Sequence, residues 1–135
     1  MICLDTNVVI GLLNGRNLRL RERYDAQIAQ KAEIVFPAIS LFEMRFGHAK
    51  SKRRAEADRR LDELLARGVD VIPFEAEDAA HAGEIRALLE AAGTPIGAYD
   101  VLIAAQARRR GATFVTLNTR EFDRVPRLKI EDWAM

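Results

Sequence analysis

Three acidic residues stand at comparable places in the sequence and could together hold a divalent metal ion. Asp5 follows the apolar run Ile2–Leu4, Glu43 comes shortly after the apolar run Ile34–Phe36, and Asp100 opens a later apolar segment. Carboxylates that gather at one place repel one another unless protons or a cation neutralise them. Oxygen ligands without nearby Cys or His favour Mg²⁺ or Mn²⁺ over zinc. Such an ion activates water and stabilises charge on a phosphoryl oxygen, so phosphodiester hydrolysis is the predicted chemistry.

Each of these acids also has a purely structural interpretation. Acidic side chains are favoured in the first turn of a helix, where free backbone N–H groups and the helix dipole attract them. Asp5 or Thr6 could cap the helix that follows the first apolar run. Ser40 and Glu43 have the spacing of a capping box, which predicts that a helix begins near Ser40. Asp100 falls in the first turn of an apolar helix, so the metal hypothesis requires that the three acids meet in space.

The pattern along the chain predicts an α/β fold in which helices cover both faces of a mostly parallel sheet of four to five strands. Strands that alternate with helical segments of ten or more residues are typical of that class. Ligands bind in such folds at the carboxyl ends of the strands, so Asp5 would lie at the mouth of a crevice. We expect strands at 2–4, 34–36, 69–72, 114–117 and 128–130. We expect helices from the elbow at 5–7 to about 14, at 18–32, at 40–48, around 57–65, around 82–92 and at 98–110.

Composition is that of an ordinary globular protein. The 135 residues fit one domain, 1–135, with 49% hydrophobic and 30% charged residues. No apolar run approaches the length of a membrane span and no signal peptide is recognisable, so we expect a cytoplasmic protein without a membrane partner. The single cysteine, Cys3, lies within the first apolar run and is expected to be a buried thiol.

The net charge of +1 gives no overall field that would attract nucleic acid. Basic residues are nevertheless concentrated between Arg45 and Arg60, either to follow an RNA backbone or as a solvated helix face. A second cluster, 108–110, ends a helix and is expected to be structural. His48 and His81 have no pattern that pairs them, which argues against a metal-free ribonuclease using two histidines. The sequence also lacks a glycine-rich phosphate loop and a nucleophile elbow.

Four segments, in order along nearly the whole chain, make the sequence resemble a PIN-domain nuclease, and more narrowly a VapC-type toxin of bacterial toxin–antitoxin pairs. They are Leu4-Asp5-Thr6-Asn7-Val8, Ser40-Leu41-Phe42-Glu43-Met44, Tyr99-Asp100-Val101-Leu102-Ile103-Ala104-Ala105-Gln106-Ala107 and Val115-Thr116-Leu117-Asn118-Thr119-Arg120-Glu121-Phe122. The resemblance implies a three-layer α/β/α fold and a Mg²⁺- or Mn²⁺-dependent endoribonuclease. It also implies a small antitoxin partner, whose tail would cover apolar grooves and place a basic side chain in the acidic crevice, and a homodimer.

In the family pattern Asp5, Glu43 and Asp100 would be the metal-binding and catalytic acids. A fourth acid is common after the fourth strand, where this chain has Asn118 and, three residues later, Glu121. Either Asn118 orients a water or Glu121 acts through the hydration shell of the metal, although Asn118 could equally be a turn residue.

Three further polar residues could support the site. Thr6, Asn7 and Thr116 are candidates to brace the carboxylates, because metal ligands need hydrogen-bonding partners that hold them in place.

Two classes of function follow. The first is an endoribonuclease in which a metal-activated water attacks RNA with an exposed single-stranded segment and leaves a 5′ phosphate; DNA remains an alternative substrate. The second is a receiver-like signalling module that binds a cation or phosphate without turnover. Receiver domains place a lysine beside their acids after a late strand, whereas this chain has Asn118 and Arg120 in that region.

Overall fold

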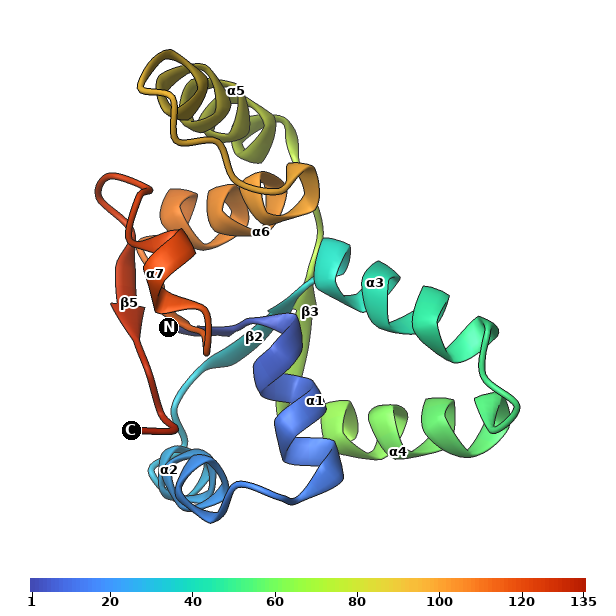
Figure 1. Cartoon of the computed structure of the whole chain (residues 1–135). Helices are drawn as coiled ribbons and strands as arrows, with labels where there is room; N and C mark the ends of the chain where they lie inside the picture. Colours follow the sequence, from blue (N-terminus) through green and yellow to red (C-terminus); the bar gives the residue numbers. More distant parts are fainter.

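A five-stranded, fully parallel sheet forms the centre of the protein (Figure 1), described here from a computed structural model covering residues 1–135. The strand order is β3-β2-β1-β4-β5, and every neighbouring pair is parallel. The strands are β1 (Ile2–Leu4), β2 (Ile34–Pro37), β3 (Val69–Ile72), β4 (Thr113–Val115) and β5 (Lys129–Glu131). The predicted parallel sheet is therefore confirmed.

Seven helices surround the sheet. They are α1 (Thr6–Asn14), α2 (Leu18–Ala29), α3 (Ala38–Ala49), α4 (Arg54–Ala66), α5 (Ala76–Ala91), α6 (Ala98–Arg109) and the short α7 (Thr119–Phe122). None of them combines the length and the apolar character that a membrane crossing requires.

Successive side chains along the strands point to opposite faces of the sheet and belong to two separate hydrophobic cores. Cys3, Val35 and Phe114 point to the face that α5, α6 and α7 cover, and their cluster includes Ile85 and Ile103. Their chain neighbours, including Leu4, Phe36 and Val115, point to the opposite face, which α1, α2, α3 and α4 cover. A strand buried on both faces reads as a continuous apolar run, as in β1 and β2. The predicted three layers and the buried Cys3 are confirmed.

Strand order places the first strand at the centre and creates a switch point beside it. The chain runs outward from β1 through β2 to β3, then returns over the sheet through α5 and α6 to pair β4 with the free side of β1. Ligand sites of open α/β sheets lie where the strand order reverses in this way. Receiver domains have the order 2-1-3-4-5. The receiver-like alternative is therefore wrong for this fold, because β1 lies between β2 and β4.

The predicted capping box at Ser40 and Glu43 is wrong. Helix α3 begins at Ala38, with Pro37 at its N-cap, so Ser40 and Glu43 both lie inside the helix. Pro37 is the last residue of β2 and has an extended backbone, so the helix begins directly after it, two residues before Ser40. The Glu43 side chain is thereby left free to act elsewhere, and Glu43 does not lie in the first turn of its helix.

Smaller differences concern the ends of elements. Helix α2 ends at Ala29 instead of near residue 32, and β4 and β5 lie at 113–115 and 129–131 instead of 114–117 and 128–130. The end of α1 agrees with the prediction, because Gly15 follows it with a φ of 68° that glycine adopts without strain.

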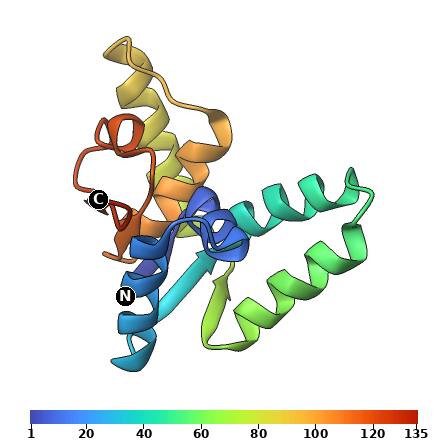
Figure 2. The same ribbon diagram turned by 60° about the horizontal axis from the view of Figure 1, so that its bottom comes forward.

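Helices α3 and α4 pack against each other and project away from the sheet as a pair, as both views show (Figures 1 and 2). Helix α1 packs beside them. A groove of about 210 Å³ lies among these three helices, and its lining includes Ile10, Leu13 and Met44. The segment from Val8 to Leu13 is thus divided: Val8, Val9 and Leu12 are core, whereas Ile10 is 44% exposed.

Candidate active site

Asp5 lies directly beyond the carboxyl end of β1 and is held there by three hydrogen bonds. Its backbone N–H donates to the carbonyl of Val115 at 2.9 Å, which continues the pairing of β1 with β4. Its carboxylate accepts from the backbone N–H of Thr6 and from the Thr116 hydroxyl, each at 2.8 Å. Asp5 is therefore a helix N-cap, as one interpretation predicted, and also a buried carboxylate at the switch point.

The electrostatic surroundings of Asp5 oppose its negative charge. Burial raises the pKa of the Asp5 carboxyl, and the nearby charges of Glu43 and Glu121 raise it further, against the hydrogen bonds from Thr116 and Thr6 that lower it. A buried carboxylate surrounded by other carboxylates is the environment in which a cation binds favourably.

Glu43 reaches the same place from the second turn of α3. The Thr6 hydroxyl donates to Glu43 Oε1 at 3.1 Å, which connects the N-terminus of α1 to α3. The backbone N–H of Thr6 also donates to Asp5, so one residue hydrogen-bonds to two carboxylates that are 38 positions apart in sequence.

Asp100, in the first turn of α6, completes the group. Burial raises its pKa to about 7, together with the charges of Glu121, Asp5 and Glu43 and a hydrogen bond between the carboxyl groups of Asp100 and Glu121. The charges of Asp5 and Glu43 thus act on Asp100, and their joint binding of a cation stays a prediction.

Glu121 is held beside the three acids by the turn after β4 and the turn before α6. One of its oxygens accepts from the backbone N–H of Gly97 at 3.2 Å, and the other accepts from the side-chain amide of Asn118. The backbone N–H of Asn118 in turn donates to the Thr116 hydroxyl at 3.0 Å. A continuous chain of hydrogen bonds therefore runs from Asp5 through Thr116 and Asn118 to Glu121.

The donor set of this cluster fits a hard divalent cation. All its charged atoms are carboxylate oxygens, and the dominant influences on the raised pKa values of Asp5 and Asp100 are burial and other acids, not a basic partner. No group of three or more Asp, Glu, His or Cys side chains is arranged in this structure so that it could hold a metal ion. The acids are thus neighbours with unbalanced charge, and they do not form a preformed cage.

Comparison with known proteins identifies the family of the chain. Residues 2–128 match the PIN domain family. The chain belongs to the PIN domain family. The tRNA(fMet)-specific endonuclease VapC of Shigella flexneri is 37% identical over 131 residues, which are 97% of this chain and 96% of that protein. Ribonuclease VapC2 of Rickettsia felis is 36% identical over 136 residues, with 96% of each chain covered.

Solved structures agree with this assignment. The crystal structure of VapBC2 from Rickettsia felis bound to a DNA fragment from their promoter matches with a TM-score of 0.91 and 34% identity, over 98% of this chain and 99% of that chain. The structure of VapBC-1 from nontypeable Haemophilus influenzae matches with a TM-score of 0.89 and 31% identity over the whole of both chains. The resemblance to VapC-type PIN proteins is therefore confirmed.

Not every predicted supporting residue reaches the acids of this PIN domain. Thr6 and Thr116 hydrogen-bond to carboxylates, whereas Asn7 is exposed on α1 and its side chain makes no hydrogen bond. Asn118 contacts Glu121 instead of acting only as a turn residue.

Gly97 is a part of the site that was not among the predicted site residues. Its N–H donates to Glu121, and a Cβ placed on it would lie 3.1 Å from Asp100 Oδ2. The sequence offers one signal for this role, a glycine three residues before an acid at the start of a helix.

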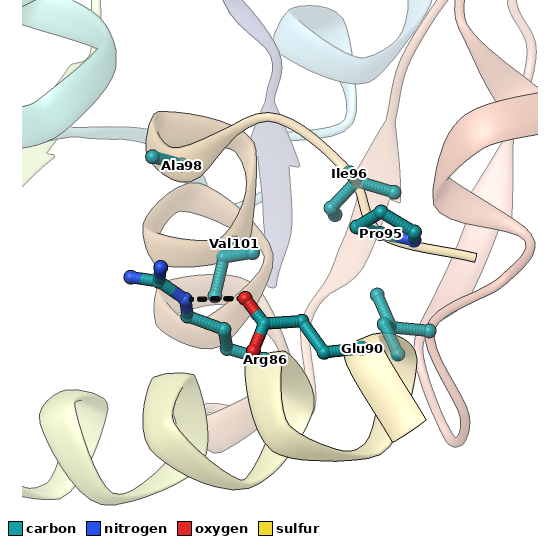
Figure 3. A pocket seen from close by; sticks show the side chains of 7 residues that line it. Arg86, Glu90, Pro95, Ile96, Ala98 and Val101 are labelled. Atoms are coloured by element: carbon teal, nitrogen blue, oxygen red, sulfur yellow. Dashed lines mark hydrogen bonds and ion pairs between the residues drawn. The ribbon is translucent and has the colours of Figure 1, made fainter. Parts of the chain in front are cut away.

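A small pocket of about 70 Å³ lies beside this turn, between α5 and the start of α6 (Figure 3). Pro95 and Ile96 border it on the loop side and Val101 on α6, and an ion pair of 3.0 Å between Arg86 and Glu90 lies at its edge. None of the acids described above lines it. The pocket is small and no carboxylate of the site lines it, so it is not the reaction site.

The basic cluster 108–110 is structural, as predicted. The guanidinium groups of Arg109 and Arg110 each donate to Asp78 Oδ1 at 2.9 Å, and Arg108 donates to Glu84 at 3.1 Å. These contacts attach the end of α6 to α5 on the far side of the sheet from α1.

Proposed function

We propose that this PIN domain is a Mg²⁺- or Mn²⁺-dependent endoribonuclease and the toxin of a toxin–antitoxin pair. The single observation that carries the proposal is the gathering of Asp5, Glu43, Asp100 and Glu121 at the switch point without a basic partner. Relatives over nearly the full length are named as a tRNA(fMet)-specific endonuclease and as ribonucleases, which supports RNA as the substrate and transfer RNA as the first to test.

The residues of this chain would divide the work as follows. Asp5, Glu43 and Asp100 hold the ion, with Asp5 fixed in orientation by the Thr116 hydroxyl and Glu43 by the Thr6 hydroxyl. The ion, when bound, supplies an activated water and stabilises charge on the phosphoryl group. Glu121, held by Gly97 and Asn118, stands beside Asp100 and adds its negative charge to the site.

The partner part of the proposal rests on the groove among α1, α3 and α4. Two structural relatives, VapBC2 from Rickettsia felis and VapBC from Salmonella typhimurium, are complexes. A partly apolar groove, with a half-exposed Ile10 in its lining, offers a segment of a small antitoxin a place to bind. We also propose the homodimer that the resemblance implied, to be measured by sedimentation.

The decisive experiment is incubation of purified protein with transfer RNA and with a single-stranded oligoribonucleotide in Mn²⁺, with an EDTA control. We expect cleavage in Mn²⁺ and none in EDTA. Asp100→Asn should abolish cleavage, whereas Asp70→Asn should not, because Asp70 is exposed on the outer strand β3 and carries the same change of charge. Equal cleavage by the Asp100→Asn protein would refute the proposal.

A further inference from the structure

The three exposed aromatic side chains of the protein form one continuous row. Phe42, Phe46 and Tyr99 are 49%, 55% and 50% exposed, whereas the remaining aromatic side chains are buried or partly buried. The rings of Tyr99 and Phe42 meet edge to face, with centroids 5.5 Å apart. The rings of Phe42 and Phe46 are nearly parallel, with centroids 6.4 Å apart and an angle of 19°. Large aromatic surface in one exposed row indicates a binding function.

Two of the three rings are adjacent in sequence to acids of the site. Phe42 directly precedes Glu43, and Tyr99 directly precedes Asp100, so neighbouring positions on α3 and α6 carry the rings and the acids. From there the row follows α3 towards the tip of the α3–α4 pair, away from the sheet.

The far end of the row is positively charged. The ammonium group of Lys50 lies 4.4 Å from the centre of the Phe46 ring. Lys50, Lys52 and Arg53 are exposed and form no ion pair, whereas Arg45 and Arg59 are paired with acids of α4. Arg60 also lacks an acidic partner and donates to the carbonyl of Leu13. Three of the four unpaired cations of the basic stretch therefore lie directly after the end of α3, next to the end of this aromatic row.

We propose that Tyr99, Phe42 and Phe46 stack unpaired bases of the RNA on its path to the acidic site, while Lys50 contacts a backbone phosphate. This inference rests on the proposed function and names the surface by which the substrate is held. Aromatic rings followed by free cations are the two elements of single-strand binding, because every base has a face to stack and every linkage a charge.

A second copy of the chain fits the row less well than RNA does. Surfaces buried between protein copies are depleted of lysine at their centre. Here the end of the row lies directly beneath Lys50, next to Lys52 and Arg53. Self-association through this row is an outcome that the experiment distinguishes.

The test measures binding of a labelled single-stranded RNA of about 12 nucleotides, a length within the range that such grooves cover. The Asp100→Asn protein is used throughout so that the RNA is not cut. We expect Phe42→Leu and Phe46→Leu each to raise the Kd about ten-fold, and Phe46→Trp to preserve it, since stacking needs a ring. Leu88→Ala, which removes an equally exposed apolar side chain from α5, is the control and should have no effect.

Two further measurements separate stacking from charge. An oligonucleotide with abasic positions should bind the Phe46→Leu and unchanged proteins equally. The slope of log Kd against log salt should be the same for Phe46→Leu as for the parent, whereas Lys50→Gln should reduce it by about 0.7, the value for one lost phosphate contact on a single strand.

Unchanged Kd values for Phe42→Leu and Phe46→Leu would overturn the inference. So would sedimentation data in which these substitutions dissociate a dimer and leave RNA affinity unaltered. Cleavage by the protein with its natural Asp100 distinguishes this failure from failure of the proposed function. If the protein with its natural Asp100 cuts RNA in Mn²⁺ and the Phe46→Leu substitution leaves its KM unchanged, only the stacking surface is wrong. If the protein with its natural Asp100 cuts no RNA at all, the nuclease proposal is wrong.

Discussion

Acidic residues gather at two places in this fold, and only one of the two groups is neutralised. Around Asp78, burial works to raise the pKa of the carboxyl, but hydrogen bonds from Arg109, the backbone of Glu75 and Arg110 outweigh it and lower the pKa. Around Asp100, burial and further acids act in the same direction and raise the pKa to about 7.

The difference separates a structural site from a functional one. A buried carboxylate that receives its hydrogen bonds from arginines stabilises the attachment of α6 to α5 and needs no further partner. A group of carboxylates without nearby cations destabilises the fold. Such groups are found mainly at functional sites, where the unbalanced charge is used. Burial alone does not distinguish the two, since Asp5 and Asp78 are both buried. The sign of the surrounding charge does.

The largest effect is expected from Asp78→Ala. The substitution leaves Arg109 and Arg110 without their shared partner and should reduce the free energy of unfolding by about 3–5 kcal/mol, as removal of one member of a buried ion pair does. Urea unfolding followed by circular dichroism measures this. Per folded molecule, RNA cleavage should be unaffected; a specific loss of cleavage with normal stability would contradict the comparison.

Asp5→Asn should have the opposite profile. Loss of a metal-binding carboxylate is expected to reduce kcat/KM by about 100-fold or more, which exceeds the effect of changing a group that only supports a ligand. The melting temperature should stay the same or rise, because the native pKa of Asp5 is raised and the charge is therefore unfavourable in the fold. Cleavage rates in Mn²⁺ and a thermal melt in EDTA check both halves of this expectation.

The order of elements and the gathering of acids were predictable from the sequence, but the local geometry was not. Apolar runs and helical stripes are local signals, so all five strands were expected within one or two residues. The role of Glu43 was obscured because Ser40 and Glu43 have capping-box spacing, whereas the helix already begins at Ala38. Strand order depends on contacts between distant segments and carries no local pattern. The hydrogen bond from Gly97 to Glu121 joins two turns 24 residues apart, which no periodicity indicates.

Thr116→Val tests whether the hydrogen bonds of the acidic site orient Asp5. Valine keeps the shape of the side chain but removes the donor to Asp5 and the acceptor for the N–H of Asn118. We expect a roughly 10-fold loss of kcat/KM and a weaker apparent affinity for Mn²⁺, in the range typical of residues that orient metal ligands. Thr116→Ser keeps the hydroxyl and should restore both values. If serine and valine are equally impaired, packing and not the hydroxyl is what matters at this position.

The smallest effect is a pH dependence of stability at Asp100 in the absence of metal. The pKa of Asp100 is about 7 in the fold and near 3.8 in the unfolded chain, so the folded state holds the proton more tightly. Stability therefore falls as pH rises from about 4 to 7, and Asp100→Asn removes this loss. Because the side chain is partly exposed and screened by water, the gain should be only about 1 kcal/mol above pH 7 and should vanish near pH 4. Thermal melts of both proteins in EDTA across this range measure it.

The corresponding change at the neutralised site, Asp78→Asn, should destabilise the protein at pH 7 and less so in acid. The pKa of Asp78 is lowered in the fold, so its stabilising contribution is lost as pH falls. Two substitutions of the same chemical kind would then move stability in opposite directions, and parallel pH profiles for the two would show that the acids near Asp100 are compensated after all.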